Sequence, residues 1–268
     1  MLGSFSLQEA IETPLWPVVA LALGLIVGSF ANVCIHRLPL RQSVVTPRSR
    51  CPRCGAAISA RDNVPLLSYA LLRGRCRHCR APISVRYPLV EGINGGLYLG
   101  LALQHGPTLR TLALMAFVTA LLVLSLIDLD HRILPNVITL PGIAVGLAAS
   151  LLPGPPPPLS AAVGAAGGYL AFWAVAAAYR RARGIEGLGQ GDWKMTAMIG
   201  AFLGWDQMLL AVFIASVAGT LVGLGLIAFR GGNGKYALPL GTFLGLAGIV
   251  VTFVGGPVTT WYRGLLHG

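Results

Sequence analysis

Long apolar runs alternate with short polar segments along most of this chain, which is the pattern of a protein that crosses a membrane several times. A membrane-spanning helix needs about 20 mostly apolar residues, with a range of roughly 17–25. We predict eight spans from these runs, at residues 14–35, 88–103, 111–127, 134–152, 159–179, 195–205, 207–229 and 236–258. The sixth is short: a helix from about Asp192 to Trp205 would rise only about 21 Å, less than the ~30 Å hydrocarbon core.

Composition agrees with this interpretation. Hydrophobic residues make up 55% of the 268 residues and charged residues only 11%, whereas soluble domains carry about 25% charged residues. Small residues spaced four apart let helix backbones approach each other in lipid. We therefore predict helix-packing faces at glycines spaced four apart within the spans: Gly92/Gly96/Gly100, Gly142/Gly146, Gly219/Gly223 and Gly241/Gly245.

The net charge of +11 is distributed in a way that predicts topology. Eleven of the 20 Lys and Arg residues lie in a polar insertion between the first and second spans, and most of the others border apolar runs. If the insertion is cytoplasmic, the alternation of spans places the turns at 128–132, 180–194 and 230–235 on the same side, as the positive-inside rule expects. This pattern predicts membrane lipid as a partner and argues against nucleic-acid binding.

Four cysteines in the insertion form two CxxC pairs, Cys51/Cys54 and Cys76/Cys79. Two such pairs at this spacing can close a tetrahedral thiolate site around zinc, and a metal would help a short polar segment to fold. Disulfides or unrelated thiols are the alternatives, and the predicted cytoplasmic location argues against disulfides. Cys34, at the end of the first span, is interpreted as a packed small residue.

These features define a fold class and three segments. We predict an all-α polytopic membrane protein of about eight transmembrane helices, with a small cytoplasmic zinc-binding insertion between the first and second. Residues 1–36 contain the N-terminus and the first helix, residues 37–87 the insertion, and residues 88–268 the membrane core.

Acidic residues are few, and four of the nine form two clusters on the predicted cytoplasmic side. Asp128 and Asp130 directly follow the third span, while Glu186 and Asp192 flank a glycine-rich turn with Gly189 and Gly191. Carboxylates at the membrane edge are costly and usually functional. Two aspartates that share a proton can act as base and acid in hydrolysis, or they can form the proton relay of a transporter. For Asp130 we favour a solvated side chain.

Several ordered motifs resemble the prepilin peptidase family, which are GxGD-type membrane aspartyl proteases. The similar stretches are residues 28–39, the segments 62–65, 73–76 and 86–91 around the cysteines, the aspartate clusters, and Lys235 with 239–241. The resemblance implies that Asp128 and Asp192 are catalytic, with Gly189, Gly191, Glu186 and Lys194 in support. Asn136 and Met195 depart from the commonest residues of the family without an evident effect on the chemistry.

The resemblance also implies substrates, a second activity and a location. Bacterial members cut a short basic leader from prepilins and pseudopilins after a glycine, in the bacterial inner membrane. Many then methylate the new N-terminus with S-adenosylmethionine, and the zinc insertion favours this two-activity form. The predicted cytoplasmic segments have no glycine-rich strand-to-helix signature for a nucleotide cofactor. We therefore predict that Glu91, near the start of the second span, contacts the methyl donor. The alternative is a helix-end carboxylate paired with Arg86 or another arginine.

Overall fold

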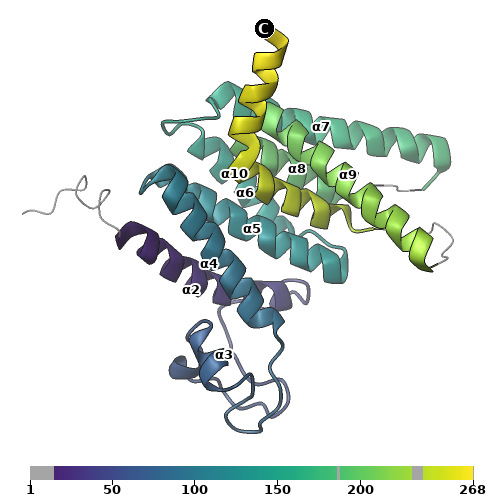
Figure 1. Cartoon of the computed structure of the whole chain (residues 1–268). Coiled ribbons are helices and arrows are strands. Elements are labelled where there is room, and N and C mark those ends of the chain that lie inside the picture. Colours follow the sequence, from purple (N-terminus) through teal and green to yellow (C-terminus); the bar gives the residue numbers. More distant parts are fainter. Residues whose placement is uncertain (1–14, 186–187, 231–237, 268) are drawn as a thin grey trace, which may run out of the picture. The chain divides into compact units, whose positions relative to one another are not determined.

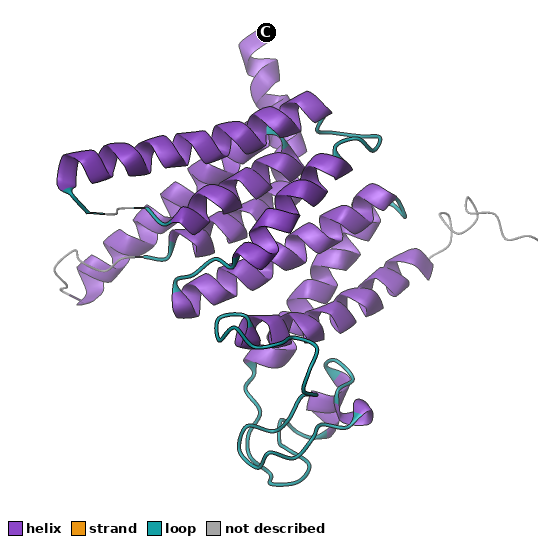
Figure 2. Cartoon of the chain, turned by 180° about the vertical axis from the view of Figure 1, so that it is seen from behind, coloured by secondary structure: helices purple, strands orange, loops and turns teal. Residues whose placement is uncertain are grey.

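The structure, a computed structural model, describes residues 15–185, 188–230 and 238–267, and throughout these residues its regular elements are helices (Figures 1 and 2). Eight long helices occur in this part of the chain, at the places of the eight predicted spans. The predicted fold class, an all-α membrane protein with a cysteine-bearing insertion after the first long helix, is confirmed.

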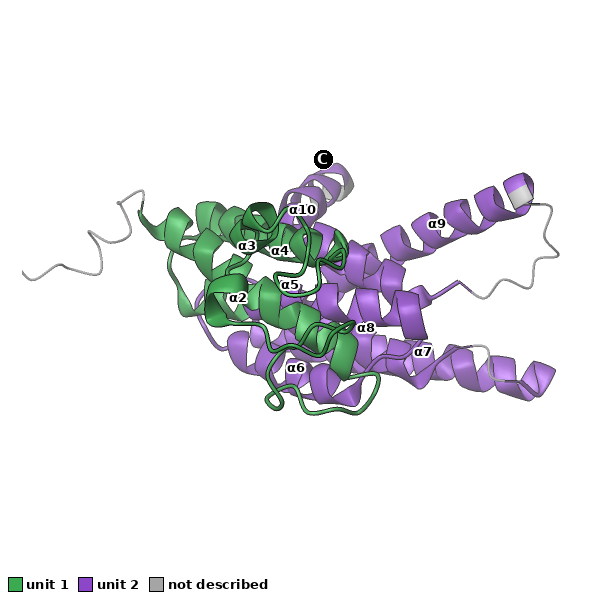
Figure 3. Cartoon of the chain, turned by 90° about the horizontal axis from the view of Figure 1, so that it is seen from below, with its two compact units in different colours: residues 1–115 green, residues 116–268 purple. Residues whose placement is uncertain are grey.

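The helices divide between two compact units, and the boundary falls within α5 (Figure 3). The first unit, Met1–Met115, contains α2 (Leu15–Arg37), the 3-10 helix η1 (Ala60–Asp62), α3 (Leu67–Leu71) and α4 (Arg86–His105). The second, Ala116–Gly268, contains most of α5 (Leu109–His131) and α6 (Asn136–Ala149), α7 (Pro158–Arg183), α8 (Gln190–Leu203), α9 (Trp205–Arg230) and α10 (Leu240–His267). The three segments predicted from the sequence, residues 1–36, 37–87 and 88–268, describe function and not compact units, and they stay a prediction.

Five helices are long and apolar enough to cross a membrane: α2, α5, α7, α9 and α10. Helix α6 is apolar but shorter, and α8 has 14 residues, as the sequence predicted. On α9 only 11% of the most apolar window is buried, so most of its surface would contact lipid. The chain is thus a multi-pass membrane protein in which not every helix has the length of a full span.

In the first unit, α2 and α4 pack closely through glycines and asparagines. A Cβ added at Gly24 would lie 2.8 Å from the Tyr98 Cβ, and one at Gly95 would lie 2.8 Å from Leu25 Cδ2. The fully buried Asn94 donates a hydrogen bond to the Gly24 carbonyl at 2.8 Å. Such contacts hold helices together in lipid, where burial of apolar surface contributes little.

The predicted packing faces are partly wrong. On α4, a Cβ at Gly96 would meet nothing within 4 Å, and Gly95, one residue earlier, makes the close contact with α2. The predicted glycines of α4 lie on a different face from Gly95, because neighbouring residues of a helix point about 100° apart. The pairs Gly142/Gly146 and Gly241/Gly245 do lie against other helices, and Gly219/Gly223 make looser contacts with Phe243 and Leu238.

In the second unit, the short helix α8 is enclosed by its neighbours. It packs against α6, α7, α9 and α10, and each of its residues from Met195 to Leu203 is buried. Phe202 also stacks on Phe117 of α5, with ring centroids 4.3 Å apart. A helix surrounded in this way is held by packing on all sides, which fixes the position of its N-terminal turn.

Several helices, among them α5, α7 and α10, extend beyond their predicted ends, and in α5 and α7 this changes where charged residues lie. Helix α5 continues to His131, so Asp128 and Asp130 belong to its last turns and do not follow it in a loop. Helix α7 continues to Arg183, with three arginines in its last turn, and ends at Gly184, whose φ of 70° suits a glycine cap. The prediction ended each span at the first charged residues, whereas a helix can continue beyond the apolar region into a polar one.

Helix α7 offers a matched test of the close packing on α8. At Gly164 a Cβ would lie 2.8 Å from the Gly200 carbonyl oxygen and from the Trp205 nitrogen, whereas at Gly167 it would meet nothing within 4 Å. We expect Gly164→Ala to lower the free energy of unfolding by roughly 1–3 kcal/mol, since backbone atoms must move. Gly167→Ala should be neutral or slightly stabilising. Thermal unfolding of the purified variants measures both, and equal stabilities would contradict this packing.

Candidate active site and metal centre

Asp128 lies near the end of α5, almost completely buried, with 6% of its surface exposed. Its Oδ2 accepts a hydrogen bond from the Thr242 backbone N–H at 2.7 Å and lies 3.2 Å from the Thr242 hydroxyl. Thr242 belongs to the first turn of α10, whose N–H groups have no acceptor within the helix. The start of α10 therefore supplies hydrogen-bond donors to a largely buried carboxyl group.

Gly241 allows this approach. A Cβ at this position would lie 3.0 Å from Asp128 Oδ2 and 2.8 Å from Leu134 Cδ1. The segment 239–241, which resembled a closing motif, thus has a physical role: it brings the N-terminus of α10 against the carboxyl group of Asp128. The other residue of that motif, Lys235, lies outside the described residues.

Asp192 lies in the first turn of α8 and is half-buried. Its Oδ2 accepts the backbone N–H of Gly189 at 3.2 Å, so the carboxyl group caps its own helix. A Cβ at Gly191 would lie 2.7 Å from the Leu134 Cβ, which explains why a glycine precedes the aspartate. The GxGD turn is therefore a helix start that is pressed against the α5–α6 connection.

The structure brings Asp128 and Asp192 together. The side chain of Leu134 packs against the backbone next to each aspartate site. Cβ atoms added at Gly241, beside Asp128, and at Gly191, beside Asp192, would each collide with it. The two carboxyl groups are close enough for the charge of Asp128 to act on Asp192. Helices far apart in sequence thus converge on one acidic pair.

The other candidate residues lie around this pair. Lys194 donates from Nζ to Asn136 Oδ1 at 2.9 Å, which connects the first turns of α8 and α6. Asp130 is exposed, as expected for a solvated side chain. Glu186 lies outside the described residues.

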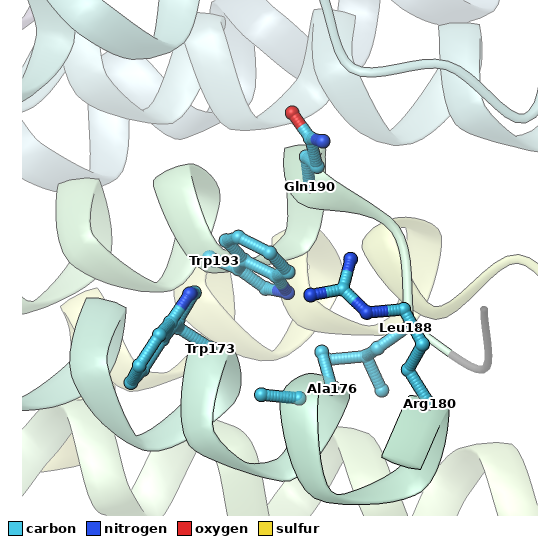
Figure 4. A pocket seen from close by; sticks show the side chains of 7 residues that line it. Trp173, Ala176, Arg180, Leu188, Gln190 and Trp193 are labelled. Atoms are coloured by element: carbon cyan, nitrogen blue, oxygen red, sulfur yellow. The ribbon is translucent and has the colours of Figure 1, made fainter. Parts of the chain in front are cut away.

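A small pocket lies beside the GxGD turn, on α7 and the start of α8 (Figure 4). Trp173, Arg180 and Trp193 form much of its lining. The Nε1 atom of Trp193 is buried and has no hydrogen-bond partner among the described residues. Tyr169 packs edge-on against the indole, with ring centroids 5.9 Å apart. The pocket belongs to the residues next to Asp192 and not to the carboxyl pair itself.

The metal centre lies in the insertion of the first unit. The Sγ atoms of Cys51, Cys54, Cys76 and Cys79 all lie within 4.8 Å of one another, and all four residues are free thiols. Cys51 and Cys79 are 3.8 Å apart at Sγ. A tetrahedron with Zn–S bonds of about 2.3 Å has edges of about 3.8 Å, so these thiols fit a structural zinc ion.

The two cysteine pairs have nearly the same backbone. In each pair the N–H of the residue after the second cysteine donates to the carbonyl of the first, Gly55 to Cys51 at 2.9 Å and Arg80 to Cys76 at 3.0 Å. Both of these following residues have positive φ angles, 71° and 57°. Backbone N–H groups of Cys54 and Arg53 lower the pKa of the Cys51 thiol to about 6, which favours the thiolate that binds metal.

Two family profiles match this chain in succession. Residues 22–105 match the bacterial peptidase A24 N-terminal domain, and residues 115–224 match the type IV leader peptidase family. A prepilin leader peptidase/N-methyltransferase of Burkholderia pseudomallei is 40% identical over 95% of this chain and 91% of its own length. The chain belongs to the type IV leader peptidase family.

Further relatives agree with this assignment. Proteins with the same name from Aeromonas hydrophila and Myxococcus xanthus are 38% and 44% identical, over 89% and 82% of this chain and 91% and 66% of their own lengths. No solved structure matches the chain. The predicted family is confirmed. The four cysteines that could bind zinc all lie within residues 22–105, which match the N-terminal profile.

Glu91 of this leader peptidase has an unexpected contact. It is 9% exposed, and its Oε2 accepts the backbone N–H of Leu66 at 2.9 Å. Leu66 has a φ of 57°, which a non-glycine residue adopts only when its surroundings fix it. Glu91 therefore anchors the insertion to α4, and its contact with a methyl donor stays a prediction.

Sequence reasoning missed two contributions to these sites. Asp62 binds Arg77 through both carboxylate oxygens at 2.6–3.0 Å, which connects η1 to the second cysteine pair. These hydrogen bonds lower the pKa of Asp62 to about 2. Thr242 was also missed, although it directly follows the quoted 239–241 motif, because a threonine has no charge to suggest a role.

Metal content tests the cysteine centre. We expect about one zinc ion per chain in the purified wild type and almost none in Cys51→Ser/Cys54→Ser, since two of the four thiolates are lost. Elemental analysis by mass spectrometry gives the ratio. Cys34→Ser is the matched control, because Cys34 lies on α2, outside the cluster, and it should keep its zinc. Unchanged zinc in the double variant would contradict the assignment.

Proposed function

We propose that this chain is a membrane aspartyl endopeptidase that removes the leader from type IV prepilins or pseudopilins and then methylates the new N-terminus with S-adenosylmethionine. The observation that carries the proposal is the pair of carboxyl groups, the buried Asp128 and the half-buried Asp192, which separate helices bring to one site. Family membership and the names of the relatives support it.

The pair has the chemistry that peptide hydrolysis needs. In the proposed mechanism the oxygen of a water molecule bonds to the scissile carbonyl carbon, and one ionised carboxylate takes a proton from that water. The other carboxyl group, which is protonated, gives its proton to the leaving amine as the carbon–nitrogen bond breaks. Because two close carboxylates cannot easily both ionise, one shared proton is the natural resting state of such a pair.

The neighbouring residues have roles in this scheme that follow from their contacts. Gly189, the N-cap of α8, places no side chain beside Asp192 Oδ2, so that a substrate backbone can approach this carboxyl group, and Gly191 lets the turn pack closely against Leu134. Lys194 holds the starts of α8 and α6 together through Asn136. Glu186 is proposed as a further supporting residue of the same turn on the strength of the family resemblance.

The proposed orientation places the zinc insertion and both aspartates on the cytoplasmic side of the bacterial inner membrane. The support is the distribution of basic residues, including the three exposed arginines in the last turn of α7. A proton-relay transporter, the alternative from the sequence, gains no support from the family or the relatives. The zinc ion would be held by Cys51, Cys54, Cys76 and Cys79, and it would stabilise the insertion without contacting substrate.

The catalytic roles of Asp128 and Asp192 can be tested by substitution, with the neighbouring carboxylate Asp130 as the control. We expect Asp128→Asn and Asp192→Asn each to lower the cleavage rate by roughly 10²–10⁴-fold, because each removes one partner in proton transfer. A recombinant type IV prepilin with its basic leader serves as substrate, and cleavage is followed as a mobility shift on gels. Asp130→Asn, an exposed position on the same helix, is the control and should keep its activity. Near-normal turnover by either of the first two variants would remove that residue from the mechanism.

The methyl-transfer activity and Glu91 can be tested on a pilin that is already cleaved. Glu91→Gln keeps an amide oxygen to accept the Leu66 N–H and loses only the charge. We expect the wild type to transfer a labelled methyl group from S-adenosylmethionine and Glu91→Gln to transfer much less, with leader cleavage intact in both. Equal transfer by the two proteins would mean that Glu91 only anchors the insertion. No transfer by the wild type would mean that the chain is a peptidase alone.

A further inference from the structure

Thr242 contacts the buried carboxyl group of Asp128 through both its backbone N–H and its hydroxyl. It is 8% exposed and lies at the start of α10, beyond residue 224, where the peptidase profile ends. Its N–H donates to Asp128 Oδ2 at 2.7 Å, and its hydroxyl lies 3.2 Å from the same oxygen. The hydroxyl also lies 3.1 Å from the Ser125 carbonyl oxygen, one turn earlier on α5.

These contacts distinguish the two oxygens of Asp128. A backbone N–H can only donate, so Oδ2 is permanently an acceptor from Thr242. A proton that Asp128 accepts or releases during a reaction is then exchanged at Oδ1, the oxygen to which Thr242 does not donate. The rigid start of α10, which Gly241 allows close to the carboxyl group, thereby fixes the rotation of the aspartate side chain.

The hydroxyl of Thr242, unlike its N–H, has two alternative hydrogen-bond acceptors. It has one proton and two acceptors within reach, Asp128 Oδ2 and the Ser125 carbonyl, so it can donate fully to only one at a time. A charged carboxylate is the stronger acceptor. The hydroxyl will point to Oδ2 when Asp128 is ionised and can turn to the Ser125 carbonyl when Asp128 carries a proton.

We propose that Thr242 is a positioning residue of the peptidase: it holds one oxygen of Asp128 so that the other exchanges the proton, and its hydroxyl turns as the charge on Asp128 changes. The inference rests on the proposed function, since it gives Asp128 a part in hydrolysis. It adds a residue outside the aspartate pair and assigns the reacting oxygen of one carboxyl group.

The test separates the hydroxyl from the shape of the side chain. Thr242→Val removes the hydroxyl and keeps the shape and the N–H, and Thr242→Ser keeps the hydroxyl. With the full chain in detergent and a recombinant type IV prepilin as substrate, we expect Thr242→Val to lower kcat roughly 10- to 100-fold with KM little changed. Thr242→Ser should restore most of kcat. Thr252→Val is the control on the same helix, because its hydroxyl donates only within α10, to the Gly248 carbonyl at 2.8 Å, and it should resemble the wild type.

Thermal unfolding accompanies each assay, and Thr242→Ala provides a second variant without the hydroxyl if the valine variant does not fold. A kcat of Thr242→Val or Thr242→Ala equal to the wild type would overturn the inference. An equal loss in Thr242→Ser would do the same, because the shape of threonine and not its hydroxyl would then matter. If the wild type itself fails to cleave the prepilin, the proposed function is overturned and this inference with it, so the two failures are distinguishable.

Discussion

A carboxyl group inside a helical bundle is unfavourable unless hydrogen-bond donors replace the water it loses, and the contact between Thr242 and Asp128 meets this requirement. The contact depends on the glycine at 241, since any side chain there would occupy the space next to the carboxyl oxygen. Helix α8, which is buried from Met195 to Leu203, holds Asp192 near the same place. The packing of the second unit can thus be understood as the support of one acidic pair.

The insertion of the first unit is stabilised by different means. It has short helices and few buried apolar residues, so burial of apolar surface cannot hold it together. Four thiols in tetrahedral reach, the bidentate pair of Asp62 and Arg77, and the hydrogen bond from Leu66 to Glu91 take the place of a core. The last of these joins the insertion to α4, so the order of the insertion and the position of a membrane helix depend on each other.

Much of this architecture could be predicted from the sequence, and the exceptions have physical causes. Apolar runs gave the number of long helices, and the two CxxC pairs gave the metal centre, because hydrophobicity and cysteine spacing are local signals. The face of α4 that packs on α2 could not be predicted, since neighbouring glycines look alike in a sequence and only the partner helix distinguishes Gly95 from Gly96. The roles of Thr242 and Glu91 arise from contacts 114 and 25 residues away along the chain, which no local pattern reveals.

The central claim is that Asp128 and Asp192 act as one unit, and a double variant tests it most directly. Residues that act together are not additive: once one has been removed, removal of the other costs little more. We predict that Asp128→Asn/Asp192→Asn cleaves a type IV prepilin about as slowly as the slower single variant, with all proteins equally folded. A double variant whose loss equals the product of the two single losses would contradict it, because the aspartates would then contribute independently.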